Sequence, residues 1–290
     1  MTSRRWSGRW GTPAAPEPPV VDVLVPTAGR RAELAATLAG LAAQDDPPFR
    51  VIISDQSDEA VTESDPTVRA LLRVLEAQGR APLVRRHLPR RGLAEQRHSL
   101  LSWASAPAVL FLDDDVWLEP GTLARLHEAL ERLGCGFVGS AVQGLSYLDD
   151  IRPHETEAFE TWEERVRPER VRRGTPEFER WPLHNAANLT HVAARLDVPE
   201  GGWRAYRVAW LGACVLYRRD ALLAVGGFDF WERLPPEHSG EDVAAQWRVM
   251  ERFGGAGLVP SGAVHLETPT TVTDRRVDAV DRLFAEEHSQ

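Results

Sequence analysis

The 290-residue sequence predicts a single α/β domain with a mostly parallel central sheet and helices on both of its faces. From residue 20 onward, short apolar runs alternate with segments that have helical spacing. Three of these runs end directly before polar or acidic residues, at Thr27, Asp55 and Asp113. The chain is 43% hydrophobic and 27% charged, which is typical of a globular protein and allows a sizeable core.

The elements follow from these patterns in chain order. Strands are expected where apolar runs lie between turn residues, at 20–25, 49–54, 83–88, 108–112, 135–142 and 207–217, with 259–266 extended. Helices are expected where apolar side chains recur every three to four positions, at 32–43, 66–78, 93–104, 120–133, 219–225, 241–253 and 274–287. Strands that alternate with helices favour parallel pairing.

Two segments lack this regularity. Residues 1–19 carry arginines and a Pro/Ala/Glu stretch without an apolar signal-peptide core, which predicts a disordered leader. Residues 144–206 are charged, broken by proline and scattered with Trp162, Trp181 and Trp203. A segment of this length without periodicity is more often a functional cover or binding loop than a structural necessity.

Composition narrows the class of protein. The 34 basic residues, all arginine, face 43 acidic ones, and the net charge of −9 argues against a generic nucleic-acid-coating role. Cys135 and Cys214 are too few for a disulfide framework or a zinc site, which favours a reducing cytoplasm. The longest strongly apolar stretch, 208–217, is well short of the ~20 residues of a membrane-spanning helix, so we expect no transmembrane segment.

The sharpest chemical signal is a run of three carboxylates, Asp113, Asp114 and Asp115, after an apolar strand. In an open α/β sheet this edge is where ligands bind. Because alternate residues of an extended segment point the same way, Asp113 and Asp115 are expected to converge on Mg²⁺ or Mn²⁺ while Asp114 faces away into the loop. The alternative is a solvated strand end that caps a helix.

A second acidic site, Glu241 and Asp242, opens the helix expected at 241–253. A carboxylate near the cation could act as a general base. The same Ser-x-x-Asp pattern, Ser239 to Asp242, is equally typical of a capping box. From spacing alone, both interpretations stay open.

Thr27 and Asp55 lie at the same sheet edge as the acidic cluster, and two further candidates lie elsewhere in the chain. Arginines flank Gly92 at a helix start, where backbone N–H groups favour a diphosphate, although solvated arginines would look alike. His265 lies in an extended segment, where a lone histidine is more often structural than a ligand.

Six motifs occur in a fixed order: Val25-Pro26-Thr27-Ala28-Gly29-Arg30, Ile53-Ser54-Asp55-Gln56-Ser57, Gly92 to Arg97, Leu112 to Val116, Gly226-Gly227-Phe228-Asp229 and Gly240-Glu241-Asp242. Together they resemble the signature of family 2 nucleotide-sugar glycosyltransferases, which have the GT-A fold. The likeness runs from about residue 20 to residue 266.

The resemblance implies a nucleotide pocket in the first half of the chain. It gives Asp55 a contact with the base, while Pro26, Thr27 and Arg30 line the pocket. Ser54 departs from the family, because many members carry a second acid there. The remaining residues implied at the nucleotide are those near the base, ribose or diphosphate: Gly92, Arg97, Asp113 and Asp114.

The resemblance also implies the reacting groups. Asp113 and Asp115 correspond to the family's Asp-x-Asp pair, with Asp115 as the direct metal ligand, and His265 matches a histidine that completes the metal shell in some relatives. Asp242 corresponds to the base of an inverting transfer, with Glu241 beside it.

We therefore expect a metal-dependent, inverting glycosyltransferase that uses a nucleoside-diphosphate sugar, with UDP favoured. The acceptor is left open between a glycan, a lipid-linked glycan and a small molecule. The expected location is the cytoplasm, or the inner membrane surface for a lipid-linked acceptor. The implied parts are a nucleotide-sugar half at 20–143, an insertion at 144–206 that forms a lid or acceptor loop, a catalytic-base half at 207–268, and a C-terminal helix within 269–290.

Two alternatives remain. A sugar-1-phosphate nucleotidyltransferase would share the sheet and the acidic cluster, but it needs a glycine-rich loop after the first strand, where residues 27–31 supply only Gly29. A noncatalytic carbohydrate-binding protein would stack Trp162, Trp181 and Trp203 on a glycan, although buried tryptophans are equally consistent with these positions.

Overall fold

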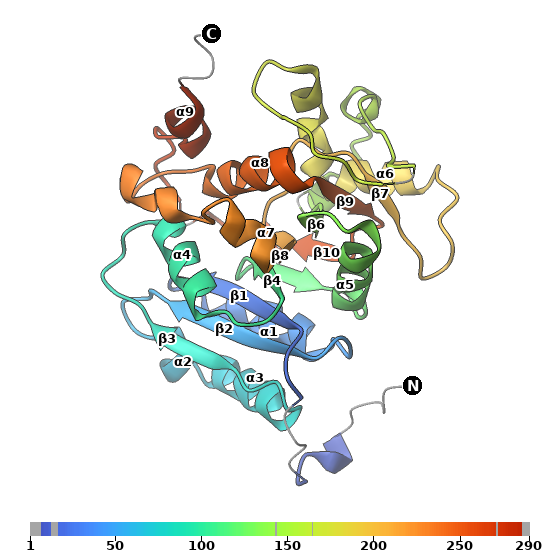
Figure 1. Cartoon of the computed structure of the whole chain (residues 1–290). Helices are drawn as coiled ribbons and strands as arrows, with labels where there is room; N and C mark the ends of the chain where they lie inside the picture. The colour runs from blue at the N-terminus through green and yellow to red at the C-terminus, as the bar shows by residue number, and fades with distance from the viewer. Residues whose placement is uncertain (1–6, 13–16, 143, 164, 271, 286–290) are drawn as a thin grey trace.

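The computed structural model describes residues 7–12, 17–142, 144–163, 165–270 and 272–285. Within them, eight strands form one sheet in the order β3-β2-β1-β4-β8-β6-β9-β7 (Figure 1). The strands of this sheet are β1 (Val21–Thr27), β2 (Phe49–Asp55), β3 (Leu83–Arg86), β4 (Ala108–Leu112), β6 (Phe137–Ser140), β7 (Arg204–Tyr206), β8 (Cys214–Arg218) and β9 (Gly255–Val259). Four of the seven pairings are parallel, so the expected mostly parallel sheet is confirmed.

Helices cover both faces of this sheet (Figure 1). The α-helices are α1 (Arg31–Ala42), α2 (Val61–Ser64), α3 (Pro66–Ala77), α4 (Leu93–Trp103), α5 (Thr122–Leu133), α6 (Ala186–Ala193), α7 (Arg219–Ala224), α8 (Glu241–Phe253) and α9 (Ala279–Phe284). Short 3₁₀ turns add η1 (Ser7–Arg9), η2 (Leu145–Tyr147), η3 (Pro153–Thr156), η4 (Pro176–His184) and η5 (Asp229–Arg233).

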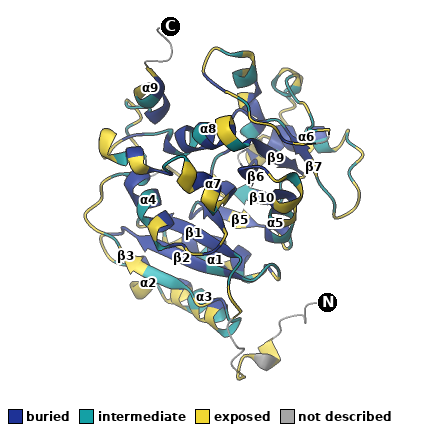
Figure 2. Ribbon diagram, in the orientation of Figure 1, coloured by how far each residue is buried: buried dark blue, intermediate teal, exposed yellow. Residues whose placement is uncertain are grey.

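Strand β1 shows why the sheet is buried on both sides. Its alternate side chains Val21 and Val23 pack into a core shared with α1, α3 and α5, whereas Leu24 packs into a second core shared with α4 and α8. All seven residues of β1 are buried, and Figure 2 shows the central strands in the colour of buried residues. A strand that is buried on both faces has no regular apolar–polar alternation, as its sequence predicted.

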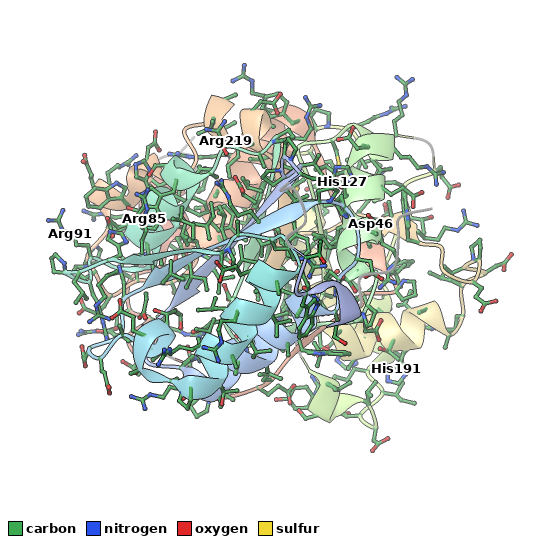
Figure 3. All side chains as sticks on the ribbon, turned by 90° about the horizontal axis from the view of Figure 1, so that it is seen from below. Asp46, Arg85, Arg91, His127, His191 and Arg219 are labelled. Atoms are coloured by element: carbon green, nitrogen blue, oxygen red, sulfur yellow. The ribbon has the colours of Figure 1, made fainter. Side chains whose placement is uncertain are left out.

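Charged side chains on the edge strand β3 disfavour its pairing with a strand of another molecule. Its last two residues, Arg85 and Arg86, are exposed, and Arg85 lies over the ring of Trp103 at 4.8 Å. Figure 3 shows Arg85 and Arg91 at this margin of the molecule. Charged side chains on an edge strand discourage association with another strand.

A small antiparallel sheet carries one part of the site. Strand β5 (Val116–Leu118) pairs with β10 (Ala263–His265), and His265 lies opposite Val116. The backbone N–H of Leu266 donates to the carbonyl of Asp115 at 2.8 Å. This pairing brings residues about 150 positions apart in sequence together at the end of β4.

Several expected elements are wrong in their extent. The strand expected at 207–217 is a strand only from Cys214, because the preceding residues turn through Ala213, whose φ is 62°. The extended segment expected at 259–266 divides into the end of β9 and β10. The insertion at 144–206 is not wholly irregular, since it contains α6, β7 and three 3₁₀ turns.

The chain ends were predicted less well. The final helix, expected at 274–287, runs from Ala279 to Phe284, where Asp278 caps it by accepting the N–H of Val280 at 2.8 Å. Its expected last residues, 286–287, lie outside the described residues. The leader is described only at residues 7–12 and 17–19, so its disorder stays a prediction.

Candidate functional site

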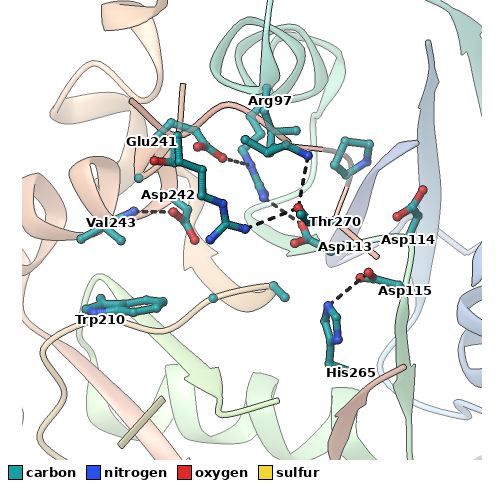
Figure 4. A pocket seen from close by; sticks show the side chains of 18 of the residues that line it. Arg97, Asp113, Asp114, Asp115, Trp210, Glu241, Asp242, Val243, His265 and Thr270 are labelled. Carbon is teal, nitrogen blue, oxygen red and sulfur yellow. Dashed lines mark hydrogen bonds and ion pairs between the residues drawn. The ribbon is translucent and has the colours of Figure 1, made fainter. Parts of the chain in front are cut away.

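A cavity of about 840 Å³ opens at the carboxyl ends of β1 and β4 (Figure 4). Most of the expected site residues line it: Pro26, Thr27, Arg30, Arg97, Asp113, Asp114, Asp115, Glu241, Asp242 and His265. The sheet register explains the meeting of the first segments, because parallel strands present their carboxyl ends at one edge. Helix α8 and strand β10 supply the remainder from the second half of the chain.

The three carboxylates after β4 each have a different main partner, although Asp114 and Asp115 share Arg30. Asp113 accepts from Arg97 at 2.8 Å, and Asp115 pairs with His265 at 3.1 Å (Figure 4). Asp114 accepts from the hydroxyl of Thr27 at 2.7 Å. Asp113 and Asp115 line the same cavity, and their convergence on a cation stays a prediction. Asp114 turns inward rather than away, because the strand ends at Leu112 and its alternation does not extend to the turn that follows.

Asp115 is surrounded by positive and hydrogen-bonding groups. It is 3% exposed, and burial alone would raise its pKa. The hydrogen bond from His265 and the charge of Arg30 outweigh this, so the pKa of Asp115 lies below its ordinary value. Arg30 contacts both Asp114 and Asp115, and its own pKa is raised by them although burial opposes its charge.

Asp115 is suited to hold a hard cation at the cavity wall. Among the residues that the structure describes, there is no cluster of three His, Cys, Asp or Glu side chains that could hold a metal ion by themselves. Mg²⁺ and Mn²⁺ are commonly held by one or two carboxylates together with substrate phosphates, and Asp115 fits that arrangement.

His265 is not in the state that metal ligation requires. Its Nδ1 accepts the backbone N–H of Glu267 at 2.8 Å, so the ring hydrogen lies on Nε2 and is donated to Asp115. A histidine that ligates a metal through Nε2 carries its hydrogen on Nδ1 and donates it to an acceptor. The turn at residues 265–267 would have to change before His265 could join a metal shell.

Arg97 joins the two acidic sites. Its guanidinium donates to Glu241 at 3.1 Å and to Asp113 at 2.8 Å, and its side chain is 3% exposed (Figure 4). Burial opposes its charge, but the neighbouring carboxylates raise its pKa well above the ordinary value. Arg97 lines the cavity and is held by carboxylates of the protein, and its expected place near the base or diphosphate stays a prediction.

Asp242 lies on the other side of Arg97 and is partly exposed to the cavity. Helix α8 begins after Gly240, whose φ is 77°, and no side chain caps it. The capping-box interpretation is therefore wrong: Ser239 uses its backbone to pair with Val277 and Ala279. Asp242 instead accepts the N–H of the next residue, Val243, at 2.9 Å.

The environment of Asp242 favours its protonated form. Burial, followed by the negative charge of Glu241, raises the pKa of Asp242 to about 7, although Arg97 acts in the opposite direction. Burial also raises the pKa of Glu241 itself. A carboxyl group with a pKa near neutral pH is well matched to taking up and releasing a proton in a reaction.

Gly92 does not line the cavity, contrary to expectation. Its φ is 98°, and a Cβ there would lie 2.6 Å from the ring of His238. That ring accepts the N–H of Ala94 through Nε2 at 3.1 Å, so His238 occupies the start of α4 where a diphosphate was expected. Burial lowers the pKa of His238, in keeping with a neutral ring that accepts a hydrogen bond.

Asp55 also lies outside the cavity lining. It is fully buried, and its two oxygens accept from the backbone of Ser57 at 2.9 Å and from the hydroxyl of Thr62 at 2.9 Å. These bonds lower its pKa although burial opposes this. In this structure Asp55 organises the loop after β2, and both of its carboxylate oxygens already accept hydrogen bonds from that loop. Its expected contact with a base stays a prediction.

Two parts of the cavity were not predicted from the sequence, apart from Trp181, which was named as a residue that could stack on a glycan. One is an aromatic stack, in which His184 lies 4.4 Å from Trp210 and 6.0 Å from Trp181, measured between ring centroids. The other is the segment after β10, which lines the cavity with Glu267, Thr268, Thr270, Val272, Arg275 and Asp278. A tryptophan in an apolar run is typical of a core, and a polar aperiodic segment is typical of a loop.

Solved structures show what the chain resembles. The mannosyltransferase PcManGT from Pyrobaculum calidifontis, in complex with GDP-Man and Mn²⁺, matches with 18% identity and a TM-score of 0.54, over 91% of this chain and 64% of that one. S. aureus TarS 1–349 matches with 18% identity and a TM-score of 0.54, over 84% and 60%. Its complex with UDP-GlcNAc matches with 16% identity and a TM-score of 0.52, over 87% and 60%.

These likenesses show a shared fold, and this chain spans less than two thirds of each of those chains. No curated protein sequence matches it. None of the helices in the described ranges is both long and apolar enough to cross a membrane. The model of glycosyl transferase family 2 matches residues 22–193, more than half of the sequence, and the chain therefore belongs to glycosyl transferase family 2.

Proposed function

We propose that this chain is a metal-dependent, inverting glycosyltransferase that moves a sugar from a nucleoside diphosphate to an acceptor hydroxyl. The observation that carries the proposal is the division of one cavity by Arg97. On one side Asp115 is kept ionised and suited to a cation, and on the other Asp242 has a pKa of about 7 and is suited to a proton.

The donor half of the cavity fits a nucleoside diphosphate. Thr27 and Arg30 lie at the end of β1 beside Asp114 and Asp115, which places a hydroxyl and a guanidinium where the donor would enter. PcManGT is described with GDP-Man and TarS with UDP-GlcNAc. We favour UDP, and a comparison of UDP with GDP tests that preference.

A divalent cation, Mn²⁺ or Mg²⁺, would be held by Asp115 and the donor phosphates, and when bound it would neutralise charge on the departing nucleoside diphosphate. Asp113 and His265 stay predicted ligands, because Asp113 is held by Arg97 and the His265 ring has its hydrogen on Nε2. PcManGT is described with Mn²⁺.

Side chains of this protein would take up the proton that the acceptor hydroxyl loses. In the ionised form, Asp242 would accept the proton of the acceptor hydroxyl as that oxygen attacks the anomeric carbon from the face opposite the diphosphate. Glu241, held by Arg97, lies beside Asp242, and when ionised its negative charge would raise the pKa of Asp242 and strengthen it as a base. Such a single displacement inverts the anomeric configuration and needs no covalent intermediate.

The test is to incubate the protein with UDP-sugars and GDP-sugars and Mn²⁺, and to measure the released nucleoside diphosphate. We expect release with at least one donor and none with EDTA. Binding of donors without release would favour a noncatalytic protein. Formation of pyrophosphate from a nucleoside triphosphate and a sugar 1-phosphate would favour a nucleotidyltransferase. The cytoplasmic location and the acceptor classes named from the sequence stay predictions.

A further inference from the structure

Arg30 connects two parts of the cavity wall. Its Nη1 donates to Asp114 at 3.3 Å and also to Asp115, and its Nη2 donates to the backbone carbonyl of Pro269. The side chain is 12% exposed, so these contacts are largely shielded from water. Arg30 therefore links the acidic cluster after β4 to the segment that follows β10.

Arg30 balances the charge of two of the three adjacent carboxylates. Neighbouring carboxylates repel one another unless a positive charge lies among them. Arg97 is shared between Asp113 and Glu241, whereas Arg30 pairs with Asp114 and Asp115. Arg30 thus already provides the compensation that a divalent cation would provide at this place.

A guanidinium and a cation compete at Asp115. They carry charge of the same sign, and Asp115 is 3% exposed, so water and salt screen the repulsion between them only weakly. A cation is therefore expected to bind well only when Arg30 has another anion to pair with. A nucleoside diphosphate is such an anion, because a guanidinium binds phosphate oxygens in a planar fork.

The segment at residues 265–269 depends on contacts from outside itself. Glu267 has a φ of 56°, which is uncommon for a residue with a Cβ, and the buried hydroxyl of Thr268 has no hydrogen-bond partner among the described residues. Both features cost stability. The bond from Arg30 to the carbonyl of Pro269 is one of the contacts that hold this conformation.

We propose that Arg30 is an internal counter-ion of the cation site: it balances Asp114 and Asp115 until a nucleoside diphosphate and a cation bind together, and its withdrawal releases Pro269. This inference rests on the proposed function and deepens it by naming how binding at the donor site is regulated. The cation alone then binds weakly because of Arg30. A residue that only lined the nucleotide pocket would leave the binding of the cation alone unchanged.

The experiment measures binding of Mn²⁺ to the full chain from the EPR signal of free Mn²⁺, without nucleotide and with saturating UDP or GDP. Arg30→Met removes the charge and keeps most of the length of the side chain, whereas Arg30→Lys keeps the charge. Arg31→Met is the matched control, because Arg31 is half exposed and pairs with Glu59 at 2.7 Å outside the cavity lining. Asp115→Asn identifies the part of the binding that belongs to this site.

We expect Arg30→Met to bind Mn²⁺ alone about tenfold more tightly than the unaltered protein does, and Arg30→Lys and Arg31→Met to stay within about threefold of it. The nucleotide should raise the Mn²⁺ affinity by a smaller factor in Arg30→Met, because less repulsion is left to remove. Arg30 makes no side-chain cap for α1, so its replacement removes no cap. Arg30→Gln, which is also neutral, gives the same test if Arg30→Met does not fold.

Hydrogen exchange tests the link to Pro269. Without Mn²⁺, the backbone amides of residues 266–270 should exchange faster in Arg30→Met than in Arg31→Met, because the carbonyl of Pro269 has lost its donor. Equal exchange in the two variants would overturn the proposed release of Pro269.

Two results would overturn the counter-ion: Mn²⁺ affinity in the neutral variants that is no higher than in the unaltered protein, or an equal gain in Arg30→Lys or Arg31→Met. If the unaltered protein binds UDP or GDP only with Mn²⁺, either result rejects the counter-ion alone. If the unaltered protein shows no Mn²⁺-dependent nucleotide binding, the proposed function is rejected as well.

Discussion

The two acidic sites of the cavity place the same side chain in opposite circumstances. Asp115 lies between His265 and Arg30, and its pKa is held below the ordinary value. Asp242 lies beside Glu241 and accepts a backbone N–H, and its pKa is raised to about 7. Burial acts to raise the pKa of both side chains. The net shifts differ in direction because the neighbouring charges and hydrogen bonds differ. One carboxylate is prepared for a cation and the other for a proton.

Removing the base should have the largest effect. We expect Asp242→Asn to lower turnover by about 10³-fold, because an amide keeps the shape but cannot accept the proton. Donor affinity should stay unchanged. Turnover, donor affinity and melting temperature are measured on one preparation, with Asp149→Asn as the control, since Asp149 is an exposed carboxylate.

The opposite pattern would contradict the account. Helix α8 has no side-chain cap, so Asp242→Asn should not destabilise the protein. A lower melting temperature with normal turnover would show that Asp242 has a structural role and would favour Glu241 as the base.

The next effect concerns the cation site. We expect Asp115→Asn to weaken binding of nucleoside diphosphate in the presence of Mn²⁺ by about 100-fold, because the acidic cluster repels phosphates unless a cation bridges them. Calorimetry with UDP and GDP, in Mn²⁺ and in EDTA, measures this. Equal affinity with Mn²⁺ and with EDTA in the unaltered protein would show that Asp115 holds no cation for the donor.

The pH dependence should report Asp242. A base works when ionised, so kcat/KM should rise with pH through about 7, the pKa of Asp242. Glu241→Gln removes the neighbouring negative charge and should shift this rise to lower pH. Because the folded chain holds this proton more tightly than the unfolded chain does, ionisation of Asp242 lowers stability as pH rises from about 4 to about 7. A rise in kcat/KM centred near pH 4 would place Asp242 among ordinary exposed carboxylates.

The smallest effect separates two roles of His265. We expect His265→Ala to weaken Mn²⁺ binding by about tenfold, and His265→Gln to restore most of it, because the glutamine amide can still donate to Asp115. Manganese titrations in the presence of UDP measure this. If His265→Gln binds Mn²⁺ as weakly as His265→Ala, the ring is itself a ligand, as the resemblance implies.

The sequence predicted elements best where local signals agree. Helix α8 runs from Glu241 to Phe253 as expected, because glycines precede and follow it and apolar residues recur at helical spacing between them. Strand β4 likewise matches its apolar run. The strand expected at 207–217 was predicted too long, because a buried loop and a buried strand have the same apolar composition.

The sequence predicted which residues line the cavity better than it predicted which of these residues contact each other. The ends of β1 and β4 and the start of α8 bring Thr27, Asp113 and Asp242 to one cavity, and the sequence predicted these element ends. Which partner each carboxylate takes depends on residues far away in sequence. The pairing of Asp115 with His265 requires β10 to lie beside β5, and no local pattern predicts it.

The central claim is that Asp115 holds the cation and Asp242 accepts the proton. The most direct test is the binding of UDP and GDP to Asp242→Asn and to Asp115→Asn, titrated with Mn²⁺ and with EDTA. We expect Asp242→Asn to bind one nucleotide with the affinity of the unaltered protein and to lose that binding in EDTA, while Asp115→Asn binds it weakly in both. Equal loss of binding in the two variants would contradict the account, since it would show that Asp115 and Asp242 serve a single site.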